Sequence, residues 1–129
     1  GFTHCPEICP TTLYELTNWV DILGNDGKNL KVFFISVDPV RDTPQMMKQY
    51  LSRFSNRITG ITGDPDEINK LTKAWYVYAK RVPLGDGEYT MDHTASIFLL
   101  TGDGNLHGTI DYKDTTNVAL EKLRSLLSL

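Results

Sequence analysis

The sequence predicts a single α/β domain over residues 1–129. Three observations support this prediction. Amphipathic helical segments alternate with short apolar runs typical of strands, a Gly-Asp-Gly turn separates two of those runs, and 129 residues suffice for one hydrophobic core but not comfortably for two. Apolar residues make up 40% of the chain and charged residues 22%, as in ordinary globular proteins. We therefore expect one folded domain with a well-buried core.

Four segments have the apolar spacing of amphipathic helices. They cover about 10–23, a stretch that opens at Thr43-Pro44, about 65–78, and a closing segment whose inner face carries Ala119, Leu123, Leu126 and Leu127. Pro10 and Pro44 suit a first helical turn, where the missing N–H would be unpaired anyway. Asp64 with Glu67 three positions later resembles a capping box. These signals fix where three of the four helices begin.

Three apolar runs are predicted as strands, at 30–37, 95–101 and 105–110. The last two flank Gly102-Asp103-Gly104, which is a hairpin signal. Residues 79–92 carry two glycines, one proline and no sustained period, so we expect a long loop there, with Gly85-Asp86-Gly87 as a turn inside it. Long loops in compact domains are often functional.

This order of elements predicts a thioredoxin-like fold if one more strand precedes residue 1. The chain then has the order β-α-β, two helices and β-β-α, which gives a central mixed sheet flanked by helices on both faces. Because the sequence opens at Gly1 without an initiator Met, we expect the N-terminal strand or strands to be missing or truncated. The first helix then begins at the carboxyl end of a central strand, where α/β folds place their chemistry.

Charge and hydropathy narrow the range of partners. The net charge is −3, and Lys and Arg are scattered among acidic residues, so the chain offers no basic stripe and nucleic acid is not an expected partner. Apolar runs such as Val32–Ile35 and Ile97–Leu100 are far shorter than the roughly 20 residues needed to span a bilayer. Nothing within this sequence is expected to cross a membrane.

Cys5 and Cys9 are the first candidate site residues, four positions apart at the mouth of the first helix. In a helical segment their β-carbons lie about 5–6 Å apart, a gap that one metal ion or a disulfide can bridge. The helix N-terminus is expected to lower the thiol pKa and make the pair reactive. The alternative is that both cysteines are small buried hydrophobes, although the following prolines and the intervening Glu7 make passive burial less suitable.

His93 is the third candidate, although a loop histidine taken alone is more often a hydrogen-bonded surface residue. In the thioredoxin arrangement the loop before the hairpin faces the start of the first helix, so His93 should arrive beside the two sulfurs. Thioredoxin-like oxidoreductases carry a cis-proline in that loop, whereas this chain has Asp92, His93 and Thr94 there, so an imidazole replaces a ring that would block access of a metal. Two thiolates and one imidazole suit Cu(I), also accept Cu(II), and leave zinc one ligand short of a closed site. Copper is therefore the expected metal, with zinc binding in vitro left open.

Neighbouring polar residues have less certain roles. Asp92 either orients the His93 ring or serves as a capping or surface residue. Asp38 and Arg41 lie on a loop that should border the site, and Arg41 is interpreted as part of the turn before the second helix. His4 is expected to point away from the sulfurs, because side chains alternate at the end of a strand.

Three stretches of the sequence carry a family resemblance: GFTHCPEICPT from Gly1, SVDPVRDTP from Ser36, and DHT from Asp92. In this order and spacing they closely resemble the Sco/SenC copper chaperones of cytochrome c oxidase assembly. The resemblance implies that Cys5, Cys9 and His93 bind copper and that the client is the dinuclear copper site of oxidase subunit II. It also implies tethering by one N-terminal transmembrane helix outside this sequence, with the domain facing the bacterial periplasm or the mitochondrial intermembrane space.

Two main functions from different classes, and a weaker third, remain after this reasoning. A metallochaperone would take up copper through the three residues and pass it on by ligand exchange. A thiol–disulfide oxidoreductase would reduce client cysteines through the Cys5–Cys9 pair, with His93 assisting proton transfer. A peroxidase dependent on Cys5 is a third alternative. The first two are compatible, because reducing a client's copper ligands prepares them for metal.

Overall fold

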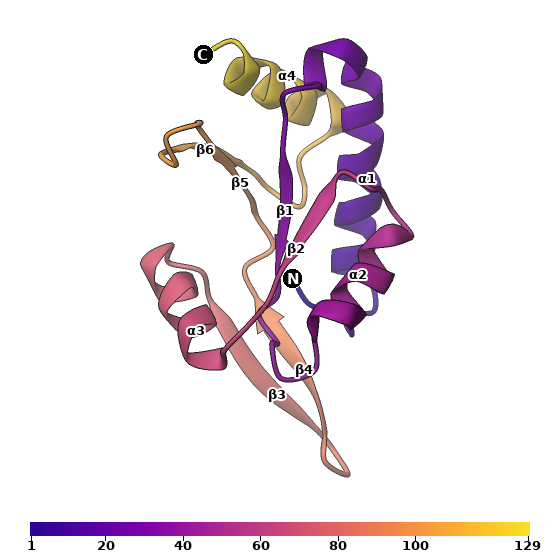
Figure 1. The fold of residues 1–129 in the computed structure, drawn as a ribbon, viewed down its shortest axis with the longest axis vertical. Helices are drawn as coiled ribbons and strands as arrows, with labels where there is room; N and C mark the ends of the chain where they lie inside the picture. Colours follow the sequence, from indigo (N-terminus) through magenta and orange to yellow (C-terminus); the bar gives the residue numbers. More distant parts are fainter. The chain divides into compact units, whose positions relative to one another are not determined.

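The computed structural model describes residues 1–129, and its elements follow one another as drawn in Figure 1. In chain order they are α1 (Ile8–Leu23), the short 3-10 helix η1 (Gly24–Gly27), β1 (Val32–Ile35), α2 (Pro44–Ser52), β2 (Ile58–Ile61), α3 (Pro65–Ala74), β3 (Ala79–Gly85), β4 (Glu88–His93), β5 (Ile97–Leu100), β6 (Leu106–Ile110) and α4 (Thr116–Leu127). The predicted α/β character and all four predicted helices are present. None of the helices combines the length and the apolar character that crossing a bilayer requires.

The chain divides into two compact units, and the boundary falls inside α1. The first unit comprises Gly1–Thr11 and Lys31–Thr94, and the second comprises Thr12–Leu30 and Ala95–Leu129. Hydrogen bonds group the strands into three two-stranded sheets: β1 with β2, β3 with β4, and β5 with β6. The first pair is parallel and the other two are antiparallel. All three candidate site residues belong to the first unit.

In the first unit, α2 packs on the β1–β2 pair. Strand β2 runs parallel to β1, with Val32 opposite Ile58 at one end of the register. A β-carbon at Gly60 of β2 would lie 2.9 Å from Leu51 and 3.1 Å from Met47, so the strand and the helix approach closely at that glycine. Strand β2 was not predicted, because its sequence Ile-Thr-Gly-Ile is too short and too broken to stand out as an apolar run.

The two proline-started helices of the first unit differ in their caps. The Thr43 side chain accepts a hydrogen bond from the Met46 amide at 3.3 Å, so α2 begins as predicted. The capping box expected at Asp64 is wrong, because its side chain makes no capping bond. Helix α3 also ends at Ala74, four residues before the expected end, because Tyr76 takes a left-handed conformation with φ 56°.

The segment expected as a long loop is instead a hairpin, so that prediction is wrong. Strands β3 and β4 pair antiparallel from Ala79 opposite His93 to a tight turn, visible at the tip of the hairpin in Figure 1. Three consecutive residues with positive φ, 98°, 52° and 81° at Gly85-Asp86-Gly87, reverse the chain. Strand β3 leaves no pattern in the sequence, because all its residues are exposed and it contains Pro83, a residue that edge strands tolerate. His93 therefore ends a strand.

The second unit contains the rest of α1, the β5–β6 hairpin and α4. The hairpin pairs Phe98 with Thr109, as its Gly-Asp-Gly turn predicted. Helix α4 is capped by the Thr115 side chain, and Trp19 Nε1 of α1 donates to Thr116 Oγ1 at 3.4 Å. The buried apolar side chains of this unit are Leu13, Leu16, Trp19, Val20, Leu23, Leu99, Ile110, Ala119, Leu120 and Leu123. The predicted hairpin and closing helix are both confirmed.

Candidate metal centre

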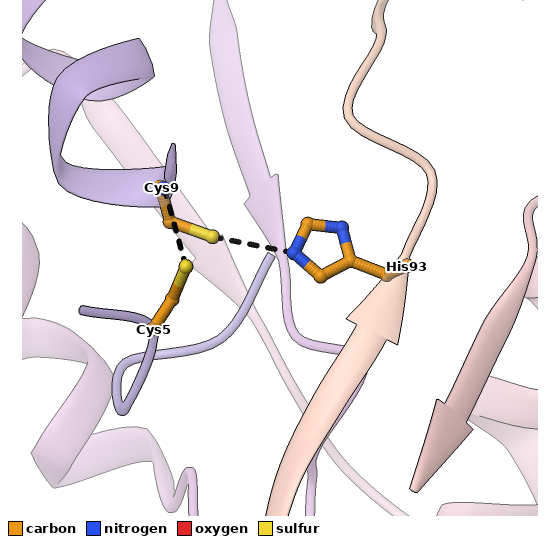
Figure 2. A group of neighbouring side chains, drawn as sticks. All are labelled: Cys5, Cys9 and His93. Carbon is orange, nitrogen blue, oxygen red and sulfur yellow. Dashed lines mark hydrogen bonds between the residues drawn. The ribbon is translucent and has the colours of Figure 1, made fainter. Parts of the chain in front are cut away.

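Cys5, Cys9 and His93 converge in the first unit. Figure 2 shows Cys5 in the segment before α1, Cys9 in the first turn of that helix, and His93 at the end of β4, with its ring turned toward the Cys9 sulfur. Their two sulfurs and one ring nitrogen all lie within 4.8 Å of one another. Both cysteines are buried free thiols, and His93 is half-buried. The structure thus brings together the three residues that the sequence singled out.

The segment that carries the cysteines is held against the end of β1. The Val37 amide donates to the Gly1 carbonyl at 2.8 Å, and the Cys5 amide donates to the Phe2 carbonyl at 3.2 Å, which closes a tight turn. A β-carbon at Gly1 would lie 2.8 Å from Cys9 Sγ, so only glycine permits this approach. The Cys9 amide, one of the unpaired donors of a first helical turn, donates to Cys5 Sγ at 3.3 Å.

Hydrogen bonding fixes which nitrogen of His93 faces the sulfurs. Nδ1 lies 2.7 Å from the Thr94 carbonyl oxygen, which can only accept, so Nδ1 carries the proton. Nε2 therefore presents its lone pair, and it lies 3.4 Å from Cys9 Sγ. The Phe2 ring packs edge-on against the imidazole with 5.6 Å between centroids. A neutral imidazole oriented through its other nitrogen is the arrangement typical of metal-binding histidines.

Burial determines the protonation of the Cys9 thiol and the His93 imidazole. Desolvation raises the pKa of the Cys9 thiol to about 12. Burial also lowers the pKa of His93, which keeps the imidazole neutral. The expectation that the helix N-terminus lowers the thiol pKa is therefore wrong for Cys9, because loss of hydration outweighs it. In the metal-free protein the Cys9 thiol donates its hydrogen to His93 Nε2.

The neighbouring polar residues take roles that the sequence left open. The Thr94 carbonyl, not the exposed Asp92 carboxylate, orients the His93 ring. His4 Nδ1 lies 3.3 Å from Thr3 Oγ1 and 4.0 Å from Asp42, and His4 is not part of the three-residue group, as expected.

Arg41 is more than a turn residue. It donates to Asp38 and, at 2.9 Å, to the carbonyl of Tyr89 in β4. Sequence reasoning missed Tyr89 and this contact, because it assigned the segment containing Tyr89 to a loop.

Comparison with known proteins identifies relatives over nearly the whole chain. The sequence model of the SCO1/SenC family matches residues 1–128. The mitochondrial protein SCO2 homolog of Danio rerio is 39% identical over 132 residues, which covers 97% of this chain and 46% of that protein. The mitochondrial protein SCO2 of Saccharomyces cerevisiae is 37% identical over 127 residues, covering 96% of this chain and 42% of that protein. The chain spans less than half the length of these two relatives.

Solved structures agree with the sequence comparison. Bradyrhizobium japonicum ScoI with copper bound has a TM-score of 0.88 and 46% identity, covering 98% of this chain and 80% of that one. Arabidopsis thaliana ScoI with copper bound has a TM-score of 0.92 and 32% identity, covering 99% of this chain and 80% of that one. These similarities confirm the predicted thioredoxin-like fold. Because the family model and these relatives match almost every residue, the chain belongs to the SCO1/SenC family.

Proposed function

We propose that this chain is the copper-carrying domain of a metallochaperone, in which Cys5, Cys9 and His93 hold one copper ion for delivery to a copper-accepting protein. The observation that carries the proposal is the convergence of two sulfurs and one imidazole nitrogen within 4.8 Å. Cys9 and His93 are 84 positions apart, so local sequence does not explain their contact. The copper-bound ScoI structures of two relatives support the choice of metal.

The donor set favours copper over zinc. Two thiolates and an imidazole match the preference of Cu(I) for soft ligands and remain acceptable to Cu(II), whereas a closed zinc site uses four protein ligands. The structure groups only three donor residues here. Metal bonds of about 2.0–2.3 Å require donors roughly 3.5–4 Å apart, which small side-chain rotations provide. A three-coordinate ion can accept an incoming thiol, so transfer can proceed by ligand exchange.

The protein's own groups prepare the uptake of copper. The Cys9 thiol and the His93 Nε2 lone pair face each other at 3.4 Å, so copper held by both residues would replace the thiol proton. The Thr94 carbonyl and the Phe2 ring hold the imidazole in place beforehand. Burial of both sulfurs keeps water away from the ion. The metal-free site thus already groups the three donors that would hold copper.

The client and the compartment follow from the family resemblance and form part of the proposal. We expect the client to be the dinuclear copper site of cytochrome c oxidase subunit II. We expect the domain to face the bacterial periplasm or the mitochondrial intermembrane space, tethered by an N-terminal membrane helix of the whole protein. Relatives described as mitochondrial and as bacterial both occur among the matches, which supports this pair of locations.

The test is a Cu(I) titration of the fully reduced protein against a chromogenic chelator, followed by the Cu(II) absorption spectrum. We expect one tightly bound copper per chain and, for His93→Ala, weaker binding with an altered spectrum. His107→Ala is the matched control, because His107 contacts Ser125 on the surface of the second unit. If His93→Ala binds copper with unchanged affinity and spectrum, the three-ligand site is wrong.

A thiol–disulfide oxidoreductase is the second candidate, favoured by the two free thiols four positions apart at a helix start. The Cys5–Cys9 dithiol would become a disulfide while a client disulfide becomes a dithiol. The high pKa of Cys9 makes it a poor attacking group, so Cys5 would have to attack first. Client reduction that persists in His93→Ala and after copper removal would favour this function over copper delivery.

A further inference from the structure

The loop that follows β1 buries two carboxylates. Asp38 is 2% exposed and Asp42 is fully buried. A buried carboxylate is costly unless its oxygens are hydrogen-bonded, so the partners of these two groups are strongly constrained. One set of partners includes Thr3, in the segment that carries Cys5, and the other includes Tyr89, in the strand that carries His93. The loop therefore contacts both segments that carry the candidate ligands without supplying a ligand itself.

Asp42 forms hydrogen bonds with the segment that leads into the two cysteines. Its Oδ2 accepts the Thr3 amide at 3.0 Å and the Ser36 hydroxyl at 2.6 Å, and its Oδ1 accepts the Thr3 hydroxyl. Thr3 lies two residues before Cys5. The backbone that leads into the first cysteine is thus fastened directly to the loop.

Asp38 and Arg41 form hydrogen bonds with β4, the strand that carries His93. The Tyr89 hydroxyl donates to Asp38 Oδ1 at 2.7 Å, and Arg41 donates through Nε to Asp38 Oδ2 and through Nη1 to the Tyr89 carbonyl at 2.9 Å. The Arg41 guanidinium also stacks 3.7 Å from the centre of the Tyr89 ring. Tyr89 therefore contacts the loop through its hydroxyl, its ring and its backbone.

Tyr89 is placed to transmit this anchoring to His93. Both residues lie on β4, four positions apart, so their side chains project from the same face of the hairpin. One contacts the loop and the other contacts Cys9. A strand is stiff over four residues, and a shift at Tyr89 would displace the imidazole by a similar amount.

We propose that Arg41 and Tyr89 are positioning residues, which fasten the β3–β4 hairpin to the loop and so set the distance between the His93 imidazole and the two sulfurs. This inference rests on the proposed copper function, because the ligand role of His93 gives the distance its importance. Neither residue touches the metal. Their loss should uncouple His93 from the site and leave a two-sulfur site.

The test uses substitutions that keep volume or charge. Tyr89→Phe removes only the hydroxyl, and Arg41→Lys keeps the charge but loses the planar fork that bonds two partners. We expect each to weaken copper binding by roughly tenfold, the lower end of what loss of an orienting partner costs a metal site. Arg81→Lys is the control, because Arg81 lies 4.1 Å from the centre of the same ring without bonding Asp38. It should change copper affinity little.

A double-mutant cycle separates positioning from general stability. In a His93→Ala background, Tyr89→Phe should have no further effect on copper affinity, because the imidazole that it positions is gone. An undiminished effect in that background would overturn the proposal. If His93→Ala alone left copper binding unchanged, the proposed function would fail instead, so the two failures are distinguishable.

A metal-free measurement tests the anchoring itself. Amide hydrogen exchange along β4 should accelerate in Tyr89→Phe and in Arg41→Lys, and stay unchanged in Arg81→Lys. Thermal unfolding of each variant first establishes that it folds. If Tyr89→Phe fails to fold because Asp38 loses a partner, Arg41→Lys alone carries the test. Unchanged exchange and unchanged copper affinity in both folded variants would refute the positioning role of Arg41 and Tyr89.

Discussion

Cys9 and His93, two of the three proposed copper ligands, form a hydrogen bond with each other in the metal-free protein. The thiol pKa of about 12 and the lowered imidazole pKa have the same first cause, loss of hydration on burial. Because the carbonyl of Thr94 fixes the proton on Nδ1, Nε2 accepts from the thiol in the metal-free protein and is free to bind metal when the thiol ionises. At neutral pH the thiol and the imidazole are therefore both uncharged and hydrogen-bonded to each other.

Copper affinity should rise with pH because the Cys9 proton must leave. Below the thiol pKa, each proton displaced by the metal makes apparent affinity increase about tenfold per pH unit. We predict that the slope of log affinity against pH between 6.5 and 8.5 is smaller by about one in Cys9→Ser than in the wild type. Chelator competition for Cu(I) at four pH values measures both slopes. Equal slopes would mean that Cys9 is already ionised in the metal-free protein.

Acid should destabilise the metal-free protein partly through His93. Burial lowers its folded pKa below the usual histidine value of about 6.5, so the stability from its neutral form is present above about pH 6.5 and is lost as pH falls through the lowered folded value. We predict that the free energy of unfolding drops less between pH 7.5 and 5 in His93→Gln than in the wild type. Urea unfolding at each pH measures this difference. His107→Gln, at a surface histidine of the second unit, is the control.

The grouping of Cys5, Cys9 and His93 could be predicted from the sequence, but the pKa shift of Cys9 could not. The spacing of Cys5 and Cys9 and the place of His93 before an apolar strand are sequence features. The thiol pKa depends on burial by residues distant in the chain, and helix position alone gave the wrong sign for Cys9. The partner of His93 Nδ1 is also a backbone carbonyl, which every residue possesses, so no side-chain signal marks Thr94.

At the scale of elements, periodicity predicted the four helices and the strands β1, β5 and β6, and it missed β2, β3 and β4. Helices α1, α2 and α4 and the β5–β6 hairpin have apolar faces that leave a pattern. Strand β3 has no buried residue, so period-two alternation is absent and backbone pairing alone defines it. Sequence reasoning did place a turn at Gly85-Asp86-Gly87, but without a pattern in the flanking residues that turn did not predict two strands.

The turn of the β3–β4 hairpin gives a prediction at this scale. Gly87 has φ 81°, which disfavours residues with a β-carbon, while the space around it is open. Gly87→Ala should therefore lower the free energy of unfolding by about 1 kcal/mol through backbone strain alone. Gly63→Ala is the matched control, since Gly63 has equally open surroundings without the positive φ, and it should be close to neutral. Chemical denaturation of the two variants measures the difference.

At the scale of the whole chain, the three donors differ in how they are brought together. Cys5 and Cys9 are four positions apart and remain close even in an unfolded chain. His93 is 84 positions from Cys9, so it approaches the sulfurs only in the folded chain. The unfolded chain can thus offer copper two sulfurs, whereas the folded chain offers two sulfurs and an imidazole. Folding thus adds one candidate ligand.

Stabilisation of the fold by copper should therefore depend on His93. A metal that binds only the folded state adds up to about 4 kcal/mol at a free concentration 1,000 times its dissociation constant, and binding to the unfolded state reduces this gain. Under the proposed function the cysteine pair would bind copper in both states, so the net gain would reflect the added imidazole. We predict that Cu(I) raises the melting temperature of the wild type under anaerobic conditions and raises that of His93→Ala much less. An equal rise in both proteins would show that folding contributes no ligand, and the cysteine pair would then bind copper without help from the distant strand.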